Sequence, residues 1–397
     1  NWLIDVLAAS RYIAGHVSQN PSWLEWALES ERGEDRMRKI HAAIRELDAQ
    51  QAEENDFLAT LGRLVDQARL TTAMAIISDG TDPLQAGNWL AEAADAAAQA
   101  AMCLALKQFD LPGDFPFVCL AMGKHGSREM GLLSDLDMVF VLVHDEPASI
   151  GAKGKSLRDW AQRIGRRVIQ HLSMQPPYGA GYRFDARLRP SGSAGVLVTT
   201  LEGFRDYQMH KAQTWEHQAL CRARPVAGPA PACRQVDKVV RHVLAASRDR
   251  QALAGEVLAM RRRMMSHLGS HDATIINLKQ DAGGLVDIEF LAQYARLAFG
   301  GEHTGTVATL RHLPVTVPSF WQDAAKTLAD TYVDYRSMEN ALRVQLWRSI
   351  GKLPADDTAS EWETLRRHTP VKSVAALRRR MRRTHEAFLQ LLEGEKG

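Results

Sequence analysis

The sequence predicts an α+β fold in which a small mixed sheet is flanked by an N-terminal helical segment and a C-terminal helical bundle. Residues 1–110 are rich in Ala, Leu, Glu, Arg and Gln and poor in β-branched runs, a composition typical of helices. From about 115 to 200, short apolar runs of strand length alternate with one helical pattern. From about 201 onward, apolar residues recur at helical spacing. We therefore expect three parts, 1–110, 111–232 and 233–397.

Length and composition restrict the class of protein. The chain has 397 residues, enough for two or three domains, and its formal net charge of +2 gives no argument for a nucleic-acid or membrane partner. No apolar run approaches the roughly 18 residues that span a bilayer, and no basic and apolar leader is present. Because the chain begins at Asn1 in a helical pattern, we expect it to be a piece of something longer. Its four cysteines are far apart and form no CxxC, which favours reduced thiols in a cytoplasmic protein.

Two long helices are expected in the N-terminal part, at about 52–79 and 84–108. Two apolar runs then follow, Phe117 to Met122 and Leu136 to Val143, and their length and flanking turn residues predict a pair of buried strands. Because side chains alternate along a strand, Asp135 and Asp137 are expected on one face and the residue between them on the other.

The residues between and beside these strands predict a metal-dependent nucleotide site. Two carboxylates side by side repel each other unless a cation lies between them, and Mg²⁺ is the usual cation for such oxygen ligands. The turn from Gly123 to Ser127 offers backbone N–H groups, and Lys124, Gly126 and the Ser127 hydroxyl suit a polyphosphate. The alternative for Asp-x-Asp alone is a solvated strand end.

Further along, a helix is expected near 153–173, followed by a short strand within GYRFDARLRP (181–190) and another at 196–198, for a sheet of four or five strands. Asp185 is alone on the polar face of its strand, between two arginines. With the first two acids it could hold two Mg²⁺ ions about 3.5–4 Å apart. Arg187 and Arg189 could clamp a triphosphate or departing pyrophosphate. Ion pairing is the alternative for the third acid and for both arginines.

Helical periodicity predicts the C-terminal bundle. A core stripe runs through 318–348, and a last helix is expected at about 373–393. Between these parts lies the sequence NLKQDAGGLVDIEFLAQY (277–294), in which an acid at a helix start is explained by the helix dipole.

At this point the motifs resemble a family. The Gly-Ser turn, Asp-x-Asp and later single Asp are similar to the nucleotidyltransferase fold of the DNA polymerase β type. Four stretches resemble the glutamine synthetase adenylyltransferases more closely: GKHGSREMGLLSDLDMVFV, YRFDARLRPSGSAGVLV, TWEHQALCRARPVAG and NLKQDAGGLVDIEFLAQY. They occur in the family's order and cover about 117–143, 181–228 and 277–294; the flanking helices resemble it only loosely.

The resemblance implies a function and partners. Members of that family are bifunctional, with one half that adds AMP from ATP to a tyrosine of glutamine synthetase and a homologous half that removes it by phosphorolysis. This chain has one Asp-x-Asp site and shows Arg189-Pro190-Ser191-Gly192, a pattern of the adding half. It departs from the fuller pattern at His125 and Ser127, where Leu and Gly are commoner. A PII signal protein and glutamine are expected as regulators.

Several alternatives stay open from sequence alone. The removing half would share the fold and the metal acids, and a non-catalytic nucleotide-binding regulatory module would be marked by a missing metal acid, but none is missing here. The roles of Trp215, His217, Asp287 and Glu289 are also open, although the resemblance makes Asp287 a candidate near the site.

Overall fold

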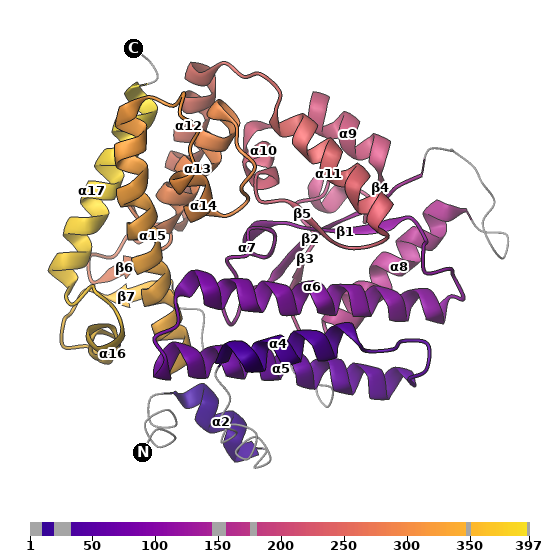
Figure 1. Cartoon of the computed structure of the whole chain (residues 1–397). Helices are drawn as coiled ribbons and strands as arrows, with labels where there is room; N and C mark the ends of the chain where they lie inside the picture. Colours follow the sequence, from indigo (N-terminus) through magenta and orange to yellow (C-terminus); the bar gives the residue numbers. More distant parts are fainter. Residues whose placement is uncertain (1–9, 20–32, 145–155, 175–180, 347–350, 395–397) are drawn as a thin grey trace. The chain divides into compact units, whose positions relative to one another are not determined.

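The computed structural model describes residues 10–19, 33–144, 156–174, 181–346 and 351–394 (Figure 1). Contacts between Cα atoms divide the chain into two compact units. The core unit consists of Glu31–Thr72 and Gly87–Ala246, and the C-terminal unit consists of Asn1–Ser30, Ala73–Ala86 and Ser247–Gly397. The three-part division expected from sequence, 1–110, 111–232 and 233–397, stays a prediction.

The core unit is built on a five-stranded mixed sheet, as the sequence predicts. Its strands are β1 (Phe117–Ala121), β2 (Leu136–Leu142), β3 (Phe184–Asp185), β4 (Val198–Thr200) and β5 (Arg224–Ala227). The order is β3-β2-β1-β5, with β4 also paired to β2. The β1 strand is antiparallel to β2 and β5, whereas β3 and β4 are parallel to β2. Every residue of β1 is buried, which explains why its sequence is a continuous apolar run.

The two short parallel strands differ from the sequence prediction. The expected alternation over 182–187 reduces to Phe184–Asp185, because the backbone N–H of Arg187 donates to Asp185 Oδ1 at 2.8 Å and turns the chain. The strand expected at 196–198 begins only at Val198. The segment between Asp185 and Val198 therefore forms turns where the sequence pattern predicted longer strands.

Helices surround this sheet in the core unit. The predicted helices at 52–79 and 84–108 are confirmed as α5 (Glu54–Ser78) and α6 (Pro83–Gln108). The alanine face of α6, which includes Ala94, Ala98 and Ala101, is fully buried and allows the close packing of neighbours. The remaining helices are α4 (Gly33–Arg45), α7 (Gly123–Gly126), α8 (Leu157–Leu172), α9 (Leu201–His210), α10 (Thr214–Leu220) and α11 (Ala230–Leu244). Residues 153–155, the expected start of α8, lie outside the described residues.

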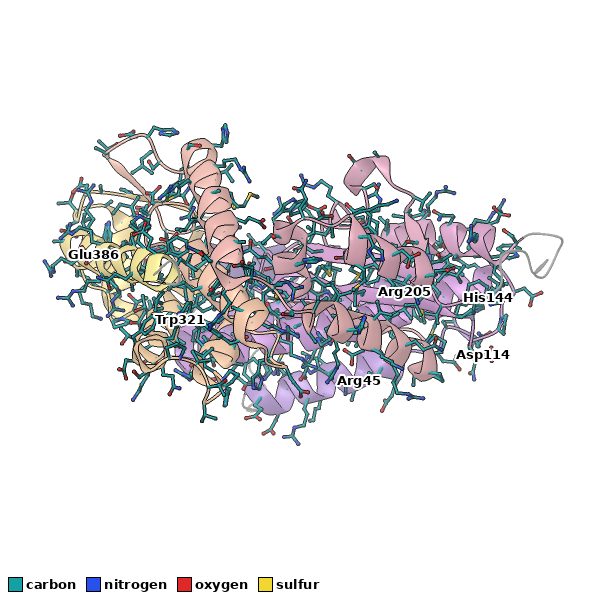
Figure 2. All side chains as sticks on the ribbon, turned by 90° about the horizontal axis from the view of Figure 1, so that it is seen from above. Arg45, Asp114, His144, Arg205, Trp321 and Glu386 are labelled. Carbon is teal, nitrogen blue, oxygen red and sulfur yellow. The ribbon has the colours of Figure 1, made fainter. Side chains whose placement is uncertain are left out.

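The C-terminal unit is a helical bundle, as predicted. Its elements are α2 (Arg11–Gln19), α12 (Arg250–Leu268), β6 (Ile275–Asn277), α13 (Leu285–Phe299), α14 (Thr306–Arg311), α15 (Ser319–Leu346), β7 (Lys352–Pro354), α16 (Ser360–His368) and α17 (Val374–Glu393). The predicted stripe of α15 is buried from Trp321 to Leu342, and residues 347–348, its expected end, lie outside the described residues. Trp321 lies among the helices, while the exposed Glu386 side chain of α17 points outward (Figure 2). Sequence reasoning missed the antiparallel pair of β6 and β7, whose three-residue strands carry too short a pattern. None of the described helices has the length and apolar composition needed to cross a membrane.

Candidate functional site

Two of the three predicted acids lie side by side in the sheet, and the third comes directly before it. In the parallel register of β2 and β3, Leu136 pairs with Phe184 and Asp137 pairs with Asp185. Directly paired residues of neighbouring strands place their side chains on the same face. Asp135 comes directly before β2, and its charge acts on the same Arg187 side chain as the charges of the other two acids, while Leu136 is fully buried.

The pKa of Arg187 shows that all three carboxylates lie near its side chain. Its pKa is raised first by the hydrogen bond to Asp185 and also by the charges of Asp137 and Asp135. One guanidinium therefore experiences the field of all three carboxylates. Its Nη2 atom lies 2.5 Å from Asp185 Oδ2, and this hydrogen bond holds the pKa of Asp185 below its usual range. The ion pair that the sequence left open for Arg187 is thus present.

A second exposed arginine pairs with the first acid. Arg183 Nε lies 2.8 Å from Asp135 Oδ1, and the Arg183 side chain is 74% exposed. The Arg187 side chain is 80% exposed, so both cations can leave the carboxylates at small cost. In the arrangement described here, Arg183 pairs with Asp135 and Arg187 pairs with Asp185.

The donor set is that of a hard divalent cation. Within the described residues, no three His, Cys, Asp or Glu side chains already stand where they could hold a metal ion. However, Asp135 Oδ1 is buried and accepts no hydrogen bond from the described part of the chain, since its contact with Arg183 lacks hydrogen-bond geometry. Carboxylate oxygens gathered on one face are the ligands that Mg²⁺ takes in phosphate-transfer sites. The donor chemistry of these residues suits such an ion, although the three carboxylates would also have to turn toward a common point to hold it.

The glycine turn meets the acids at its first residue. Gly123 opens α7 with φ of +53°, a conformation that L side chains rarely adopt. A Cβ atom built there would lie 2.1 Å from Asp137 Oδ2. The carboxylate of Asp137 therefore packs against the Gly123 backbone, and only glycine fits this position.

The other predicted turn residues lie in internal contacts. Gly126 packs against protein backbone, because a Cβ there would meet the carbonyl oxygen of Arg222 at 1.9 Å. The Ser127 hydroxyl donates to Glu129 Oε2 at 3.1 Å, and Glu129 forms a buried ion pair with Arg222 at 2.6 Å. Lys124 is the second residue of α7 and is half-buried. The nucleotide-binding roles of Gly126, Ser127 and Lys124 stay predictions.

A buried hydrogen-bond network that the sequence analysis missed connects α7 to α6 and β5. His125 is fully buried, and its Nε2 lies 2.8 Å from Asp95 Oδ1 on α6. Arg224 of β5 donates to both oxygens of Asp95, at 2.7 and 3.0 Å. A signal was present, because Asp95 is the lone acid in the run AADAAAQAA and should have been recognised as a buried partner on an apolar face.

Arg189 holds its own loop. Its guanidinium donates to the carbonyl oxygens of Ala186 at 2.8 Å, Ser193 at 3.1 Å and Gly195 at 3.2 Å. These bonds hold the loop after β3, where Ser191 has φ of +63°. The role of Arg189 as a phosphate clamp stays a prediction, and in the structure it shapes the loop that follows Asp185.

Replacing Gly123 with alanine is expected to impair the site more than the fold. The new methyl group would displace the Asp137 carboxylate and strain the backbone, with a loss of stability of about 1–2 kcal/mol and a loss of activity of at least about tenfold. The matched control is Gly113→Ala, because nothing lies within 4 Å of a Cβ built at Gly113. Urea unfolding measures the first effect, and the nucleotidyl-transfer activity expected from the sequence measures the second. Equal behaviour of both variants would contradict this geometry.

Stability of the core unit is expected to fall as pH drops below about 6.5. Burial lowers the pKa of His125 from its ordinary value of 6.5, so the unfolded chain takes up the proton first and stability is lost with falling pH. Burial acts in the same direction on His41 and His171. For Asp95, burial is opposed and outweighed by hydrogen bonds from His125 and Arg224, which lower its pKa, so its contribution is lost only in stronger acid, below the ordinary value of 3.8.

Urea unfolding at pH about 7.5 and about 5.5 measures this effect. The variant His125→Gln should lose less stability than the wild type over that interval, because one of the three histidines is gone. An identical pH dependence in the two proteins would contradict the role given to His125.

Comparison with known proteins adds to this geometry. A family model for glutamate-ammonia ligase adenylyltransferase matches residues 1–272, more than half of the chain. The chain belongs to this family. A curated relative named bifunctional glutamine synthetase adenylyltransferase/adenylyl-removing enzyme, from Thioalkalivibrio sulfidiphilus, is 39% identical over 262 residues. That match covers 63% of this chain but 26% of the relative, so the chain spans about a quarter of the length of this adenylyltransferase.

The C-terminal part has a second likeness. A family model for GlnD PII-uridylyltransferase matches residues 252–393, which lie within the C-terminal unit. The adenylyltransferase match, in contrast, spans the sequence positions of the whole core unit and of the site just described.

The residues whose roles the sequence left open make structural contacts in this family member. Asp287 is fully buried in the C-terminal unit and pairs with Arg261. Glu289 accepts a hydrogen bond from the Tyr332 hydroxyl at 3.1 Å. The remaining two lie on α10: Trp215 donates to the Gln213 side chain at 3.0 Å, and His217 Nε2 lies 2.8 Å from the Gln208 carbonyl oxygen.

Proposed function

We propose that the core unit transfers AMP from ATP to a tyrosine of glutamine synthetase and releases pyrophosphate. The observation that carries this proposal is the register of β2 and β3, which sets Asp137 beside Asp185, with Asp135 two residues before Asp137. The family match supports the nucleotidyl-transfer class. The match to a bifunctional relative supports glutamine synthetase as the protein substrate.

The acids would hold the ions and accept the proton. Asp135, Asp137 and Asp185 would coordinate two Mg²⁺ ions, which supply charge neutralisation of the triphosphate and a more acidic bound hydroxyl. An unperturbed tyrosine hydroxyl has a pKa near 10 and is a poor nucleophile at neutral pH. An aspartate is ionised at neutral pH, so the Asp185 carboxylate can accept a hydrogen bond from an incoming hydroxyl once Arg187 has turned away.

The remaining residues would handle the phosphates. The tyrosine oxygen forms a bond to the α-phosphorus while the bond from that phosphorus to the bridging oxygen of pyrophosphate breaks. Arg187 is exposed and can exchange its contact with Asp185 for a contact with the departing pyrophosphate, because guanidinium binds phosphate in a bidentate fork. Gly123 leaves room for the Asp137 carboxylate beside the turn that would face the phosphates.

Labelled ATP tests the proposal. The chain is incubated with Mg²⁺, glutamine synthetase and ATP labelled at either the α- or the γ-phosphate. We expect the α-label, and not the γ-label, to reach a tyrosine of glutamine synthetase. Binding of ATP without any transfer would instead indicate the non-catalytic nucleotide-binding module and overturn the proposal.

The second candidate is the de-adenylylating activity, because the matched relative carries both activities in its name. The two are separated by supplying phosphate and glutamine synthetase already carrying AMP on tyrosine. Release of ADP in that reaction, with no labelling from ATP, would assign the removing activity to this chain. Regulation by a PII signal protein and by glutamine stays a prediction from the resemblance.

A further inference from the structure

In the core unit α8 and the edge strand β4 contact each other, and a groove lies between them. Its volume is about 540 Å³, within the range of ligand-binding clefts. Apolar side chains line part of it, among them Leu142, Ala161, Leu197 and Val198. Val196 is 66% exposed and adds an apolar side chain that no described contact covers.

The charged residues of the groove all have one sign. Arg158 and Arg166 line it, both are exposed, and no acidic residue is among its lining residues. Neither arginine forms an ion pair or hydrogen bond with the part of the chain that the structure describes. Two cations that no described acid pairs with, beside apolar side chains, favour an anionic partner with apolar character.

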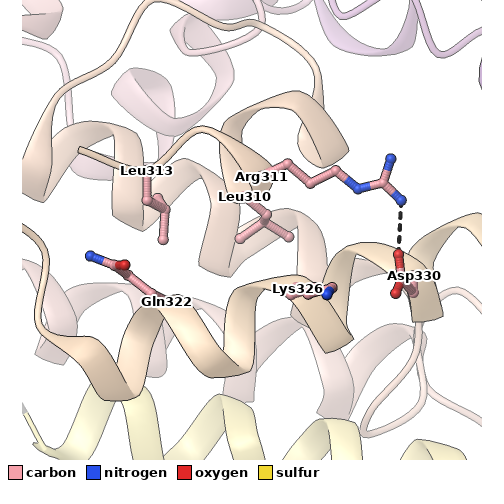
Figure 3. A pocket seen from close by; sticks show the side chains of 6 residues that line it. All are labelled: Leu310, Arg311, Leu313, Gln322, Lys326 and Asp330. Atoms are coloured by element: carbon pink, nitrogen blue, oxygen red, sulfur yellow. Dashed lines mark hydrogen bonds and ion pairs between the residues drawn. The ribbon is translucent and has the colours of Figure 1, made fainter. Parts of the chain in front are cut away.

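Charge separates this groove from the others. A groove between α14 and α15 in the C-terminal unit has about 470 Å³, but its acid Asp330 already pairs with Arg311 at 2.8 Å, which leaves Lys326 as the remaining cation of its lining (Figure 3). A third groove, beside α17, is lined by acids and bases together. Neither pattern selects a partner of one charge.

Within the part of the chain that the structure describes, no strand pairs with the outer edge of β4. Among the described residues β4 pairs only with β2, through Phe140, Val141 and Leu142. The carbonyl oxygen of Val198 accepts a hydrogen bond from the Gln162 side chain at 2.8 Å instead of from another strand. The Gln162 amide thus donates the hydrogen bond that a backbone N–H of a neighbouring strand would otherwise donate. The backbone of an added strand can take over this bond.

The spacing of the two arginines fits an extended chain. Arg158, Gln162 and Arg166 are four residues apart and lie along one face of α8. Eight residues of helix advance about 12 Å, and four residues of a strand advance about 13 Å. In a strand, residues i, i+2 and i+4 also share a face, so acids at i and i+4 can meet both arginines while i+2 faces the groove.

We infer that this groove binds an extended acidic segment of a partner protein, with acids at positions i and i+4 and an apolar residue at i+2. The segment lies along β4, its backbone takes over the bond that Gln162 makes, and its two carboxylates pair with Arg158 and Arg166. This inference does not depend on the proposed transfer of AMP.

A synthetic peptide tests the inference directly. The probe is a fluorescein-labelled peptide of sequence Gly-Glu-Thr-Val-Thr-Glu-Gly, whose binding to the full chain is followed by fluorescence anisotropy. We expect saturable binding that weakens with added salt and falls at least tenfold in Arg158→Glu/Arg166→Glu. The matched control is Arg163→Glu, on the same helix and exposed but absent from the groove lining, which should bind as the wild type does.

Two further peptides make the spacing falsifiable. A version with lysines in place of both glutamates, and one with the second glutamate moved to i+3, should each bind at least tenfold more weakly. Equal binding of all three peptides, or equal loss in the Arg163→Glu control, would overturn the inference. So would concentration-dependent dimerisation of the wild type that the double variant abolishes, because the groove would then bind a second copy of the chain. Circular dichroism of each variant establishes that it is folded.

Discussion

Replacing Asp137 with asparagine is expected to reduce AMP transfer by about a thousandfold or more while the fold is retained. A factor of a thousand corresponds to about 4 kcal/mol of lost transition-state stabilisation, a reasonable share for a carboxylate that would hold metal ions beside the phosphates. The amide has the same shape as the carboxylate, so the contact with Gly123 is preserved and one of three like charges is removed. Thermal unfolding should therefore change little.

The rate of label transfer from ATP measures this effect. The control is Asp114→Asn, because Asp114 is an exposed aspartate of the core unit (Figure 2) that lies before β1 and away from the acid cluster. Near-normal activity in Asp137→Asn, with Asp114→Asn equally active, would show that the acids of β2 are not part of the chemistry.

The largest loss of stability is expected at the buried ion pair of the C-terminal unit. Asp287 and Arg261 both have fully buried side chains. Asp287 also accepts hydrogen bonds from the backbone N–H of Gly283 at 2.7 Å and from His385 Nδ1 at 2.8 Å. The change Asp287→Ala would leave the Arg261 charge buried without its carboxylate, at a cost of about 3–5 kcal/mol in the free energy of unfolding.

An exposed ion pair provides the comparison. Asp330→Ala removes the partner of Arg311 in a pair whose side chains are 46% and 59% exposed, and should cost less than about 1 kcal/mol. The double variant Arg261→Met/Asp287→Leu should recover much of the loss, since it removes both charges together. Urea unfolding measures all three, and a loss below about 1 kcal/mol in Asp287→Ala would contradict the importance given to this pair.

The sequence predicted the elements whose patterns are long or local. The strands at 117–122 and 136–143 and the helices of α5, α6, α15 and α17 follow from apolar runs and periodicity within one segment. The shared face of Asp135 and Asp137 followed from alternation along one strand. Predicting that Asp185 lies beside them also requires the pairing between two strands. The family resemblance implied that the three acids act together, and the structure pairs Asp137 with Asp185.

What the sequence could not predict depends on contacts between distant segments. The pair of Glu129 with Arg222 joins residues 93 apart, and the contact of Arg224 with Asp95 joins residues 129 apart. From the sequence, the helix dipole accounts for an acid at the position of Asp287. In the structure its main partner is Arg261 of the preceding helix. A charged residue inside an apolar pattern signals that a buried partner exists, but not which residue it is.

The account rests on three carboxylates that gather around divalent ions beside a bound nucleotide. Electron paramagnetic resonance of Mn²⁺, titrated into the chain with a non-hydrolysable ATP analogue, measures this without any protein substrate. The account predicts about two bound ions in the wild type and the loss of at least one of them in both Asp137→Asn and Asp185→Asn. Unchanged Mn²⁺ binding in those two variants would contradict it.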